Sequence, residues 1–434
     1  MQRFMRTKSL LRKAIGAAVA LASVASVSTS IFAADWPQWR GPNRDGVSAE
    51  KGWMTKWPEK GPKVLWKAYV HGGYSSFAVV GGRVYTMGNA LDKPGPDGKY
   101  KKDEEGRALG REIVCCLDAE TGNVLWKHSY PAPAEGTQST PAVYDGRVYT
   151  LGRFGQICCL DAADGRPIWS KNLLSDFGGK LRPYSGYACS PLVLQNVVIV
   201  HAGGDALVLA LDRKTGHLAW KSGPGAGAAE SSPVPYDAGG KPGVVMLTPK
   251  VALGLNAVSG DELWRYPWKG GGYTIPTPLV HGDRVLLSVF PRDGLSLMLQ
   301  LTSSGPKEVW KTKGMGLLFH SGVLVDGHVY GPYSNSGEAD TTLLQCVSWD
   351  TGEVKWTHAG FGFSPLVAAD GKLILITDDG ELVVAEASPK AYKELARAKV
   401  FPSKSKSWVC PVLCGGRIYC RGGENAVCLD VKRQ

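Results

Sequence analysis

Eight side chains at matching positions in repeated segments are the strongest candidates for contact with a ligand. Each stands near the start of a short apolar run, and the set combines aromatic rings with one carboxylate and one imidazole. Aromatic walls with a few polar groups are typical of ligand sites, so the set could hold a sugar, a quinone or a peptide segment. The same side chains could instead simply fill a central tunnel. The candidates are Tyr74, Gln138, Tyr187, Glu230, Tyr273, His320, Phe363 and Trp408.

Motifs for the common catalytic mechanisms are missing from the sequence. It contains no G-x-S-x-G nucleophile elbow, no H-E-x-x-H zinc motif and no C-x-x-C-H haem attachment. The glycine-rich stretch at 223–227 follows a strand-like segment and opens no helix, so it indicates a loop and not a phosphate cradle. We therefore predict no catalytic residue and no metal site.

A repeated phrase indicates which elements position the eight candidates. In its clearest copy, Leu117 and Asp118 lead through a Thr-Gly turn to Trp126, and the tryptophan then recurs about every 45 residues, the length of one four-stranded propeller blade. Before each phrase, short apolar runs flank Asp-Gly or Gly-Gly pairs, which predict tight hairpins. The expected docking tryptophans are Trp66, Trp126, Trp169, Trp220, Trp264, Trp310 and Trp356.

These repeats predict an all-β protein whose residues 63–434 form a single eight-bladed β-propeller. The eighth unit lacks a fourth strand, and the segment at 63–67 is expected to supply it, which closes the ring without an exposed sheet edge. Only the seventh unit breaks the pattern, and Leu395 is expected to fill the place of its tryptophan. Residues 34–62 form an N-terminal extension whose position on the ring the sequence does not indicate.

Residues 1–33 have the three parts of a secretory signal peptide, namely a basic start, an apolar stretch and a small-residue cleavage site near Ala33. An uncleaved membrane anchor is the alternative. Cleavage lowers the formal net charge from +11 to +6, and no basic run remains that would favour nucleic acid. We expect a periplasmic or secreted monomer with no transmembrane span after cleavage.

Ten cysteines would permit disulfides in an exported chain. However, Cys115-Cys116 and Cys158-Cys159 lie in strand-like runs, where consecutive side chains point to opposite faces, so neither pair should bond to itself. We favour buried thiols over a disulfide framework and leave the pairing open.

The phrase from Leu117 to Trp126 resembles the tryptophan-docking repeat of the pyrroloquinoline-quinone (PQQ) β-propeller superfamily, and the resemblance extends from Pro62 to the C-terminus. That superfamily contains quinoprotein alcohol dehydrogenases and also non-enzymatic relatives, such as the propeller subunit of the outer-membrane barrel-assembly machinery. The segment from Asp35 to Pro42 is similar to the opening of many secreted bacterial proteins of this type. The resemblance therefore implies the fold more strongly than any activity.

For a quinoprotein, the resemblance implies a quinone held between a tryptophan and a vicinal disulfide, with calcium bound by acidic and amide side chains. Here both cysteine pairs occupy strand positions, and no set of residues matches the calcium ligands. We therefore predict an exported, non-catalytic binding scaffold of the cell envelope that has a protein or glycan partner and no cofactor. The alternative is a dehydrogenase of alcohols or sugars that depends on PQQ and calcium. No cysteine lies near the cleavage site, which argues against a lipid-anchored assembly factor.

Overall fold

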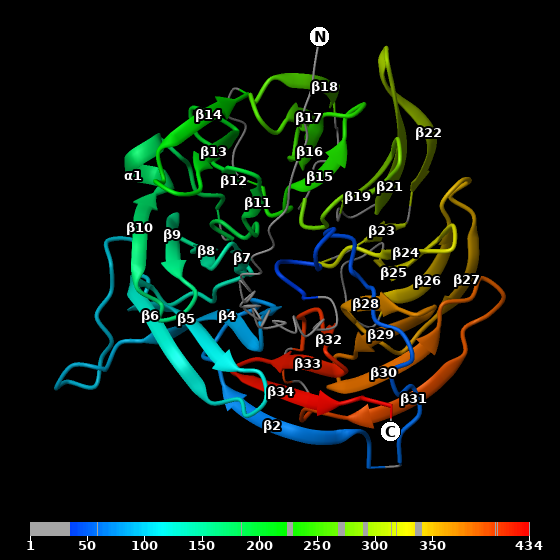
Figure 1. The fold of residues 1–434 in the computed structure, drawn as a ribbon, viewed down its shortest axis with the longest axis horizontal. Helices are drawn as coiled ribbons and strands as arrows, with labels where there is room; N and C mark the ends of the chain where they lie inside the picture. Colours follow the sequence, from blue (N-terminus) through cyan, green and yellow to red (C-terminus); the bar gives the residue numbers. More distant parts are fainter. Residues whose placement is uncertain are drawn as a thin grey trace, which may run out of the picture. The chain divides into compact units, whose positions relative to one another are not determined.

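Eight sheets of mainly antiparallel strands stand around a central axis in the computed structural model (Figure 1). The structure describes residues 35–433 apart from 59, 184, 224–228, 268–273, 290–293, 314, 318, 335–340, 404 and 406. The predicted signal peptide, residues 1–33, lies outside the described residues. The predicted all-β, eight-bladed propeller is thus confirmed.

The first four blades follow one another along the chain, each with its first strand innermost. Blade 1 contains β3 (Ala78–Val80), β4 (Arg83–Leu91), β5 (Leu109–Asp118) and β6 (Val124–Pro133). Blade 2 contains β7 (Ala142–Tyr144), β8 (Arg147–Leu151), β9 (Gln156–Asp161) and β10 (Pro167–Asn172), and the short helix α1 (Leu173–Phe177) follows it. Blade 3 contains β11 (Leu192–Leu194), β12 (Val197–His201), β13 (Val208–Asp212) and β14 (Leu218–Ser222). Blade 4 contains β15 (Val234–Asp237), β16 (Pro242–Leu247), β17 (Val251–Asn256) and β18 (Glu262–Pro267).

The second half of the ring repeats this order, with additional strands in blades 6 and 7. Blade 5 contains β19 (Leu279–His281), β20 (Arg284–Val289), β21 (Leu295–Thr302) and β22 (Gly305–Lys313). Blade 6 contains β23 (Gly316–Leu317), β24 (Val323–Val325), β25 (His328–Ser334), β26 (Leu343–Ser348) and β27 (Val354–His358). Blade 7 contains β28 (Leu366–Ala369), β29 (Lys372–Ile376), β30 (Glu381–Glu386) and β31 (Glu394–Lys399), joined by β1 (Val47–Ser48) from the N-terminal extension.

Blade 8 joins segments from near both ends of the described chain. Its strands are β32 (Val412–Cys414), β33 (Arg417–Gly422), β34 (Asn425–Asp430) and β2 (Lys63–Tyr69). The outer strand β2 pairs antiparallel with β34, which places Trp66 opposite Cys428. This pairing confirms the predicted closure and covers the edge of β34 that would otherwise be exposed.

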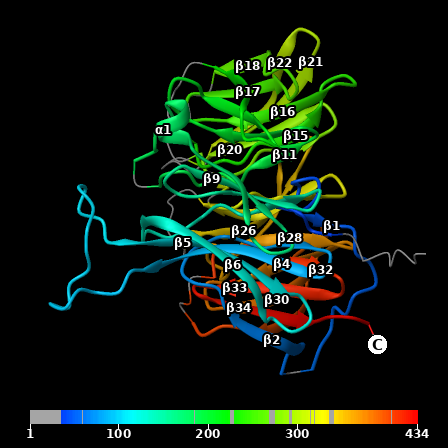
Figure 2. The ribbon, with the colours of Figure 1, turned by 60° about the vertical axis from the view of Figure 1, so that its left-hand side comes forward.

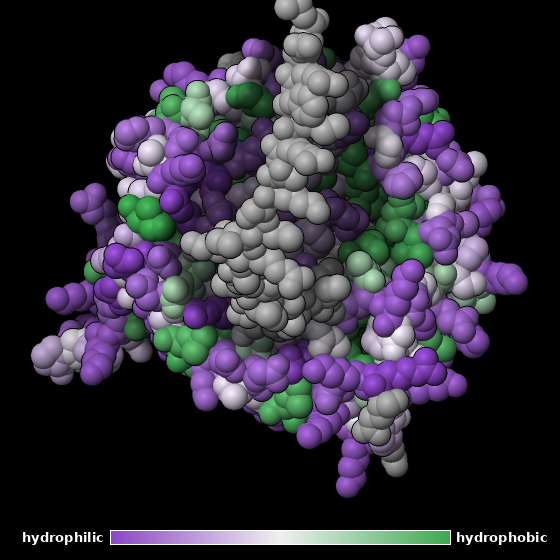
Figure 3. Space-filling view, in the orientation of Figure 1, coloured by the Kyte–Doolittle hydropathy of each residue, from purple (hydrophilic) through white to green (hydrophobic). Residues whose placement is uncertain are grey.

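A long connection between β4 and β5, residues 92–108, projects from the ring (Figure 2). Elsewhere on the face shown in Figure 3, hydrophilic residues dominate the outer rim. Among the residues that the structure describes, no helix is both long enough and apolar enough to cross a bilayer.

The predicted docking tryptophans lock neighbouring blades together. The indole N–H of Trp126 in blade 1 donates to the carbonyl of Ala162 in blade 2 at 3.1 Å. The ring covers Gly165, whose φ of 74° favours glycine and where a Cβ would run into the indole. Five other tryptophans bond to the next blade in the same way, namely Trp66, Trp169, Trp220, Trp310 and Trp356. Trp264 differs, because its N–H donates to Tyr236 of its own blade at 3.0 Å.

Blade 7 lacks a docking tryptophan, and its strand register shows which residue takes that place. Ala396 pairs with Val384 just before a β-bulge, as Trp126 pairs with Cys116, so the position falls one residue after the predicted Leu395. In the next blade, Val431 follows β34 where the other blades have their turn. The indole and the turn glycine that it usually covers are therefore both absent at this junction, while the carbonyl of Val431 remains as an acceptor.

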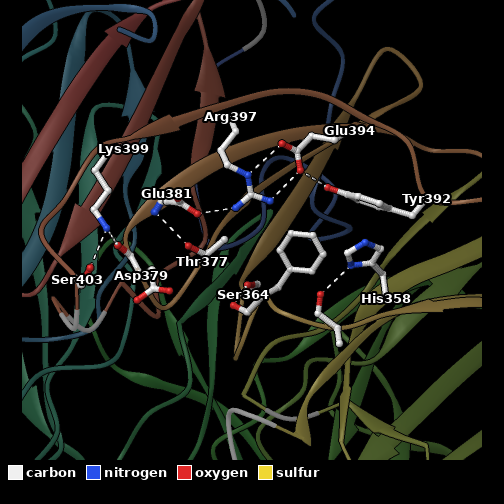
Figure 4. A network of polar contacts seen from close by, with 12 residues as sticks. His358, Ser364, Thr377, Asp379, Glu381, Tyr392, Glu394, Arg397, Lys399 and Ser403 are labelled. Carbon is white, nitrogen blue, oxygen red and sulfur yellow. Dashed lines mark hydrogen bonds and ion pairs between the residues drawn. The ribbon is translucent and has the colours of Figure 1, made fainter. Parts of the chain in front are cut away.

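The N-terminal extension occupies this junction instead. The indole N–H of Trp57 donates to the carbonyl of Arg397 at 3.2 Å, and the amide of Met54 donates to the carbonyl of Val431 at 2.7 Å. On the outer strand, Arg397 pairs with Glu381 at 2.5 Å and with Glu394 at 2.8 Å (Figure 4). Exposed ion pairs of this kind each contribute little to stability. The burial of Trp53 and Trp57 therefore contributes more than these ion pairs to stabilising the junction that lacks an indole.

Candidate ligand site at the mouth of the ring

A belt of hydroxyl groups holds the inner ends of consecutive blades together. The amide of Ser76 donates to Oγ1 of Thr140 at 3.0 Å, and the amide of Thr140 donates to Oγ of Ser190 at 2.9 Å. The amide of Ser190 in turn donates to Oγ of Ser232 at 2.9 Å. Each hydroxyl stands just before an inner strand, so the Ser/Thr-Pro steps of the repeat are explained by bonds between blades.

Residues 35–50 cross the centre of the ring, and we call this segment the plug. Its first part pairs with Val79 of blade 1 through Trp36, and its Pro37 carbonyl accepts the amide of Val143 in blade 2 at 2.8 Å. The indole N–H of Trp39 donates to Oγ1 of Thr277 in blade 5 at 3.0 Å. The plug is therefore bound by residues on opposite sides of the ring.

Two buried arginines fix the middle of the plug. Arg40 donates to the carbonyls of Ser321 at 3.1 Å and Gly322 at 2.6 Å, both in blade 6. Arg44 donates to Ser190 in blade 3 at 3.2 Å and to Pro233 in blade 4 at 2.9 Å. Charged hydrogen bonds to several carbonyls stabilise each guanidinium where water is excluded.

The end of the plug reaches the last two blades. Strand β1 runs parallel to β28, with Val47 beside Ala368, and Oγ of Ser48 donates to the carbonyl of Leu413 in blade 8 at 3.2 Å. With these contacts the plug touches all eight blades.

The plug separates two hollows at opposite ends of the inner strands. Trp39 lines a cavity of about 520 Å³ at the end where the inner strands begin, which we call the mouth cavity. Pro42 and Asn43 line a hollow of about 560 Å³ at the other end, beside Pro235. The mouth cavity is of a size that suits a small-molecule ligand.

The structure brings five of the eight predicted residues together around the mouth cavity, namely Tyr74, Gln138, Glu230, His320 and Trp408. Tyr187 lies elsewhere, because it is fully buried within blade 3 and its hydroxyl donates to the carbonyl of Ala202 at 2.7 Å. Phe363 stands behind the wall with its ring edge-on to that of Trp408, 5.4 Å between centroids. Tyr273 lies outside the described residues.

Sequence reasoning missed nine residues that also line the cavity, namely Trp39, Arg153, Ser185, Ala188, Ser190, Ser232, Ile275, Thr277 and Phe319. Two kinds of signal were available for some of them: Trp39 belongs to the tryptophan-rich opening phrase at 35–42, and Ser190, Ser232 and Thr277 belong to the repeated Ser/Thr-Pro steps. Arg153, Ser185 and Phe319 are in loops that differ from blade to blade, so the repeat could not reveal them.

One wall of the cavity is aromatic. The indole of Trp408 lies between the rings of Tyr74 and Phe319, with centroids 5.9 and 6.0 Å away and interplanar angles of 11° and 18°. Its N–H donates to Oδ1 of Asp378 at 2.9 Å, which fixes the indole in its plane. This wall presents a rigid apolar surface to any occupant.

A second wall carries charged groups that are already paired. One carboxylate oxygen of Glu230 lies 2.5 Å from Nε of Arg182 and accepts a hydrogen bond from Ser185 at 3.0 Å. Burial raises the pKa of Glu230, while the charge of Arg182 opposes that shift. The guanidinium of Arg153 lies 3.4 Å from a carboxylate oxygen of Glu135. The charges of this wall are therefore balanced within the protein.

Oε2 of Glu230 and Nε2 of His320 are buried in the cavity lining and have no hydrogen-bond partner in the described part of the chain. Burial, together with the charge of Arg40, lowers the pKa of His320 to about 3, so the imidazole is neutral near pH 7. Buried polar atoms without partners are costly, and a bound ligand can satisfy them.

Comparison with known proteins supports the relationship indicated by the repeat. A family model described as "Outer membrane protein assembly factor BamB" matches residues 110–358, more than half of the chain. The chain belongs to this family of PQQ-like β-propellers. No curated protein sequence matches it significantly.

Solved structures share the PQQ-like propeller fold at low sequence identity. BamB from Moraxella catarrhalis is 13% identical with a TM-score of 0.57, and the match covers 85% of this chain and 99% of that one. A quinohemoprotein alcohol dehydrogenase from Comamonas testosteroni is 14% identical with a TM-score of 0.61, covering 92% and 81%. A europium-containing methanol dehydrogenase is 14% identical with a TM-score of 0.64, covering 91% and 90%. These likenesses show the fold and do not distinguish a dehydrogenase from a BamB.

The residues of this PQQ-like propeller do not fit a quinone site of the kind that the resemblance implies. Cys115 and Cys116 are buried free thiols in β5 that enter different core clusters, and Cys158 and Cys159 do the same in β9. Among the described residues, no group of three His, Cys, Asp or Glu side chains is placed to hold a metal ion. A disulfide clamp and a calcium ligand set cannot therefore be assigned to these residues.

Proposed function

We propose that this chain is an exported, non-catalytic binding scaffold of the cell envelope, which holds a protein or glycan partner at its mouth cavity. The observation that carries the proposal is the cavity itself, whose walls come from several blades and whose floor is the plug that binds all eight. Such a site is pre-organised, so little ordering is required when a partner binds.

Two observations support the proposed location in the cell envelope. The predicted signal peptide at 1–33 directs export, and the family to which the chain belongs is described as an outer membrane protein assembly factor. The function of that factor suggests a protein partner here, and the aromatic wall of the cavity is equally suited to a glycan. We expect the mature protein to be a periplasmic or secreted monomer that binds no nucleic acid.

The test is capture of envelope components by the purified protein after in-vivo cross-linking. Trp408→Ala removes the centre of the aromatic wall and should abolish the capture of a partner. Tyr144→Ala is the matched control, because Tyr144 is an exposed aromatic residue at the other end of an inner strand. Capture that is unchanged in Trp408→Ala would show that the partner does not use the mouth cavity.

A dehydrogenase that depends on PQQ and calcium is the second candidate. Its support is the likeness to the quinohemoprotein alcohol dehydrogenase over 92% of this chain, together with the tryptophan wall of the cavity. The test is incubation of the purified protein with PQQ and calcium, followed by measurement of bound quinone absorption and dye-linked oxidation of alcohols and sugars. We expect neither signal. Stoichiometric binding of the quinone together with turnover would show that the protein is an enzyme and would contradict the scaffold proposal.

A further inference from the structure

We infer that the mouth cavity binds a neutral, polyhydroxylated ligand, namely one or two saccharide units of a glycan. This inference rests on the proposed binding function and narrows its partner class. It follows from three properties of the lining: unused hydrogen-bond donors, unused acceptors, and charged side chains, Glu230 and Arg153, that each have an ion-pair partner.

Three hydroxyl groups supply donors to the cavity. The oxygens of Ser190, Ser232 and Thr277 already accept hydrogen bonds from the protein, at 2.9, 2.9 and 3.0 Å. Within the described ranges, their O–H groups have no acceptor, and all three residues line the cavity. A hydroxyl has one donor and two acceptor positions, so each can still donate to a ligand oxygen.

Unused polar atoms on the same lining complement these donors. Oε2 of Glu230 can accept from a ligand hydroxyl, and its side chain is only 2% exposed. Nε2 of the neutral His320 can accept or donate, depending on the tautomer. A ligand must therefore both donate and accept at several points, and a sugar hydroxyl does both.

The pairing of the charges in the lining disfavours charged ligands, including PQQ and a cationic peptide. Glu230 is paired with Arg182 and Arg153 with Glu135, so an anionic ligand would meet two carboxylates without a new cation. PQQ is a polycarboxylate and would meet this repulsion. A cationic peptide would have to compete with Arg182 for Glu230. A neutral ligand meets neither the repulsion nor the competition, and no unpaired charge has to be desolvated when it binds.

The aromatic wall completes the match with a saccharide. One face of a pyranose ring consists of C–H groups, which pack well on aromatic surfaces, while its hydroxyls point outward to polar partners. The stacked rings of Tyr74, Trp408 and Phe319 add apolar aromatic surface to the same lining that carries Glu230 and Arg153. The volume of about 520 Å³ lies within the range of small-ligand sites.

The experiment presents the purified protein to an array of neutral oligosaccharides (glucans, mannans and galactans) alongside sulfated and sialylated glycans. The best binder is then titrated by calorimetry, and binding should also change the tryptophan fluorescence because Trp39 and Trp408 line the cavity. We expect neutral glycans to bind. Glu230→Gln should weaken binding at least tenfold, as should Tyr74→Ala, which tests the site if the first variant does not fold.

The matched control is Glu353→Gln, whose carboxylate forms an exposed ion pair with Lys355, and it should bind with unchanged affinity. Binding of charged glycans alone, or equal affinity in all variants, would overturn the inference. If no glycan binds but an envelope protein is captured in a manner that depends on Trp408, the scaffold stands and the saccharide is wrong. If neither binds, both proposals fall.

Discussion

The outer and inner walls of this ring are held by different chemistry. At the outer wall, an indole such as Trp126 covers a glycine of the next blade, and this contact is repeated with small changes around the ring. At the inner wall, hydroxyl groups and the buried arginines of the plug hold the blades, and the plug belongs to no blade. The outer contacts are interchangeable units, whereas each contact of the plug occurs once.

The difference predicts how a local change propagates. Loss of one outer contact affects the two blades that share it, as in other repeat architectures where each unit touches only its neighbours. Loss of a contact of the plug affects blades on opposite sides of the ring and also the floor of the mouth cavity. Stability and ligand binding should therefore be coupled at the inner wall and separable at the outer wall.

The largest effect is expected from Arg40→Met at the inner wall. The substitution keeps an apolar stem but leaves the carbonyls of Ser321 and Gly322, among others, without a donor. Each buried carbonyl without a partner costs about 1–3 kcal/mol, so the free energy of unfolding should fall by about 4 kcal/mol or more. Urea denaturation measures the loss, and ligand binding at the mouth should weaken in parallel. Arg265→Met, at an exposed ion pair with Glu262, is the control and should change neither.

The next effect is expected from Trp126→Ala at the outer wall. The variant leaves a cavity between blades 1 and 2 and removes the bond to Ala162, which should lower the free energy of unfolding by about 3 kcal/mol. Ligand affinity at the mouth should stay unchanged at temperatures where the variant is folded. A parallel loss of affinity would contradict the separation of the two walls.

The two walls also differ in how far the sequence predicts them. The outer wall was predicted residue by residue, because Trp126 and Gly165 recur at a fixed spacing and each copy reinforces the others. The closure by β2 was predictable for the same reason. The residue that takes the place of the tryptophan in blade 7 was predicted one position too early. Its register can be seen only in the paired strands, where Ala396 and not Leu395 lies opposite Val384.

The inner wall was predicted only where it follows the repeat. Tyr74 and Glu230 were found because they precede inner strands, whereas Tyr187 at a similar position turns into its own blade. The plug could not be placed, since Arg40 and Arg44 occur once and their partners are backbone carbonyls, which leave no trace in side-chain patterns. A contact with a backbone carbonyl that occurs only once cannot be detected from a sequence repeat.

Acid should destabilise the inner end of blade 3 through His201, which ends β12. The side chain is fully buried, and burial lowers its pKa to about 4, although an interaction with the backbone of Ser231 opposes that shift. In the unfolded chain the histidine has a pKa of about 6.5, so it becomes protonated at a pH where the folded state still holds it neutral. The free energy of unfolding should therefore fall as the pH drops below about 6.5, by roughly 2 kcal/mol at pH 5.

Urea denaturation at several pH values tests this dependence. His201→Leu should remove much of the slope between pH 6.5 and 5, while His320, with its pKa of about 3, maintains part of it. His217→Leu, at an exposed position, is the control and should leave the slope intact. A slope that is equal in all three proteins would place the acid sensitivity elsewhere.

The smallest effect is expected from Trp57→Ala at the junction of blades 7 and 8. Trp57 is half-buried and makes one hydrogen bond to the carbonyl of Arg397, so its loss should cost about 1–2 kcal/mol. A comparison with Trp126→Ala by urea denaturation measures how well the extension substitutes for an indole between blades. A loss as large as that of Trp126→Ala would mean that Trp57 takes the full part of a docking tryptophan. No loss would mean that Trp53 and the strand pairing already close the ring without it.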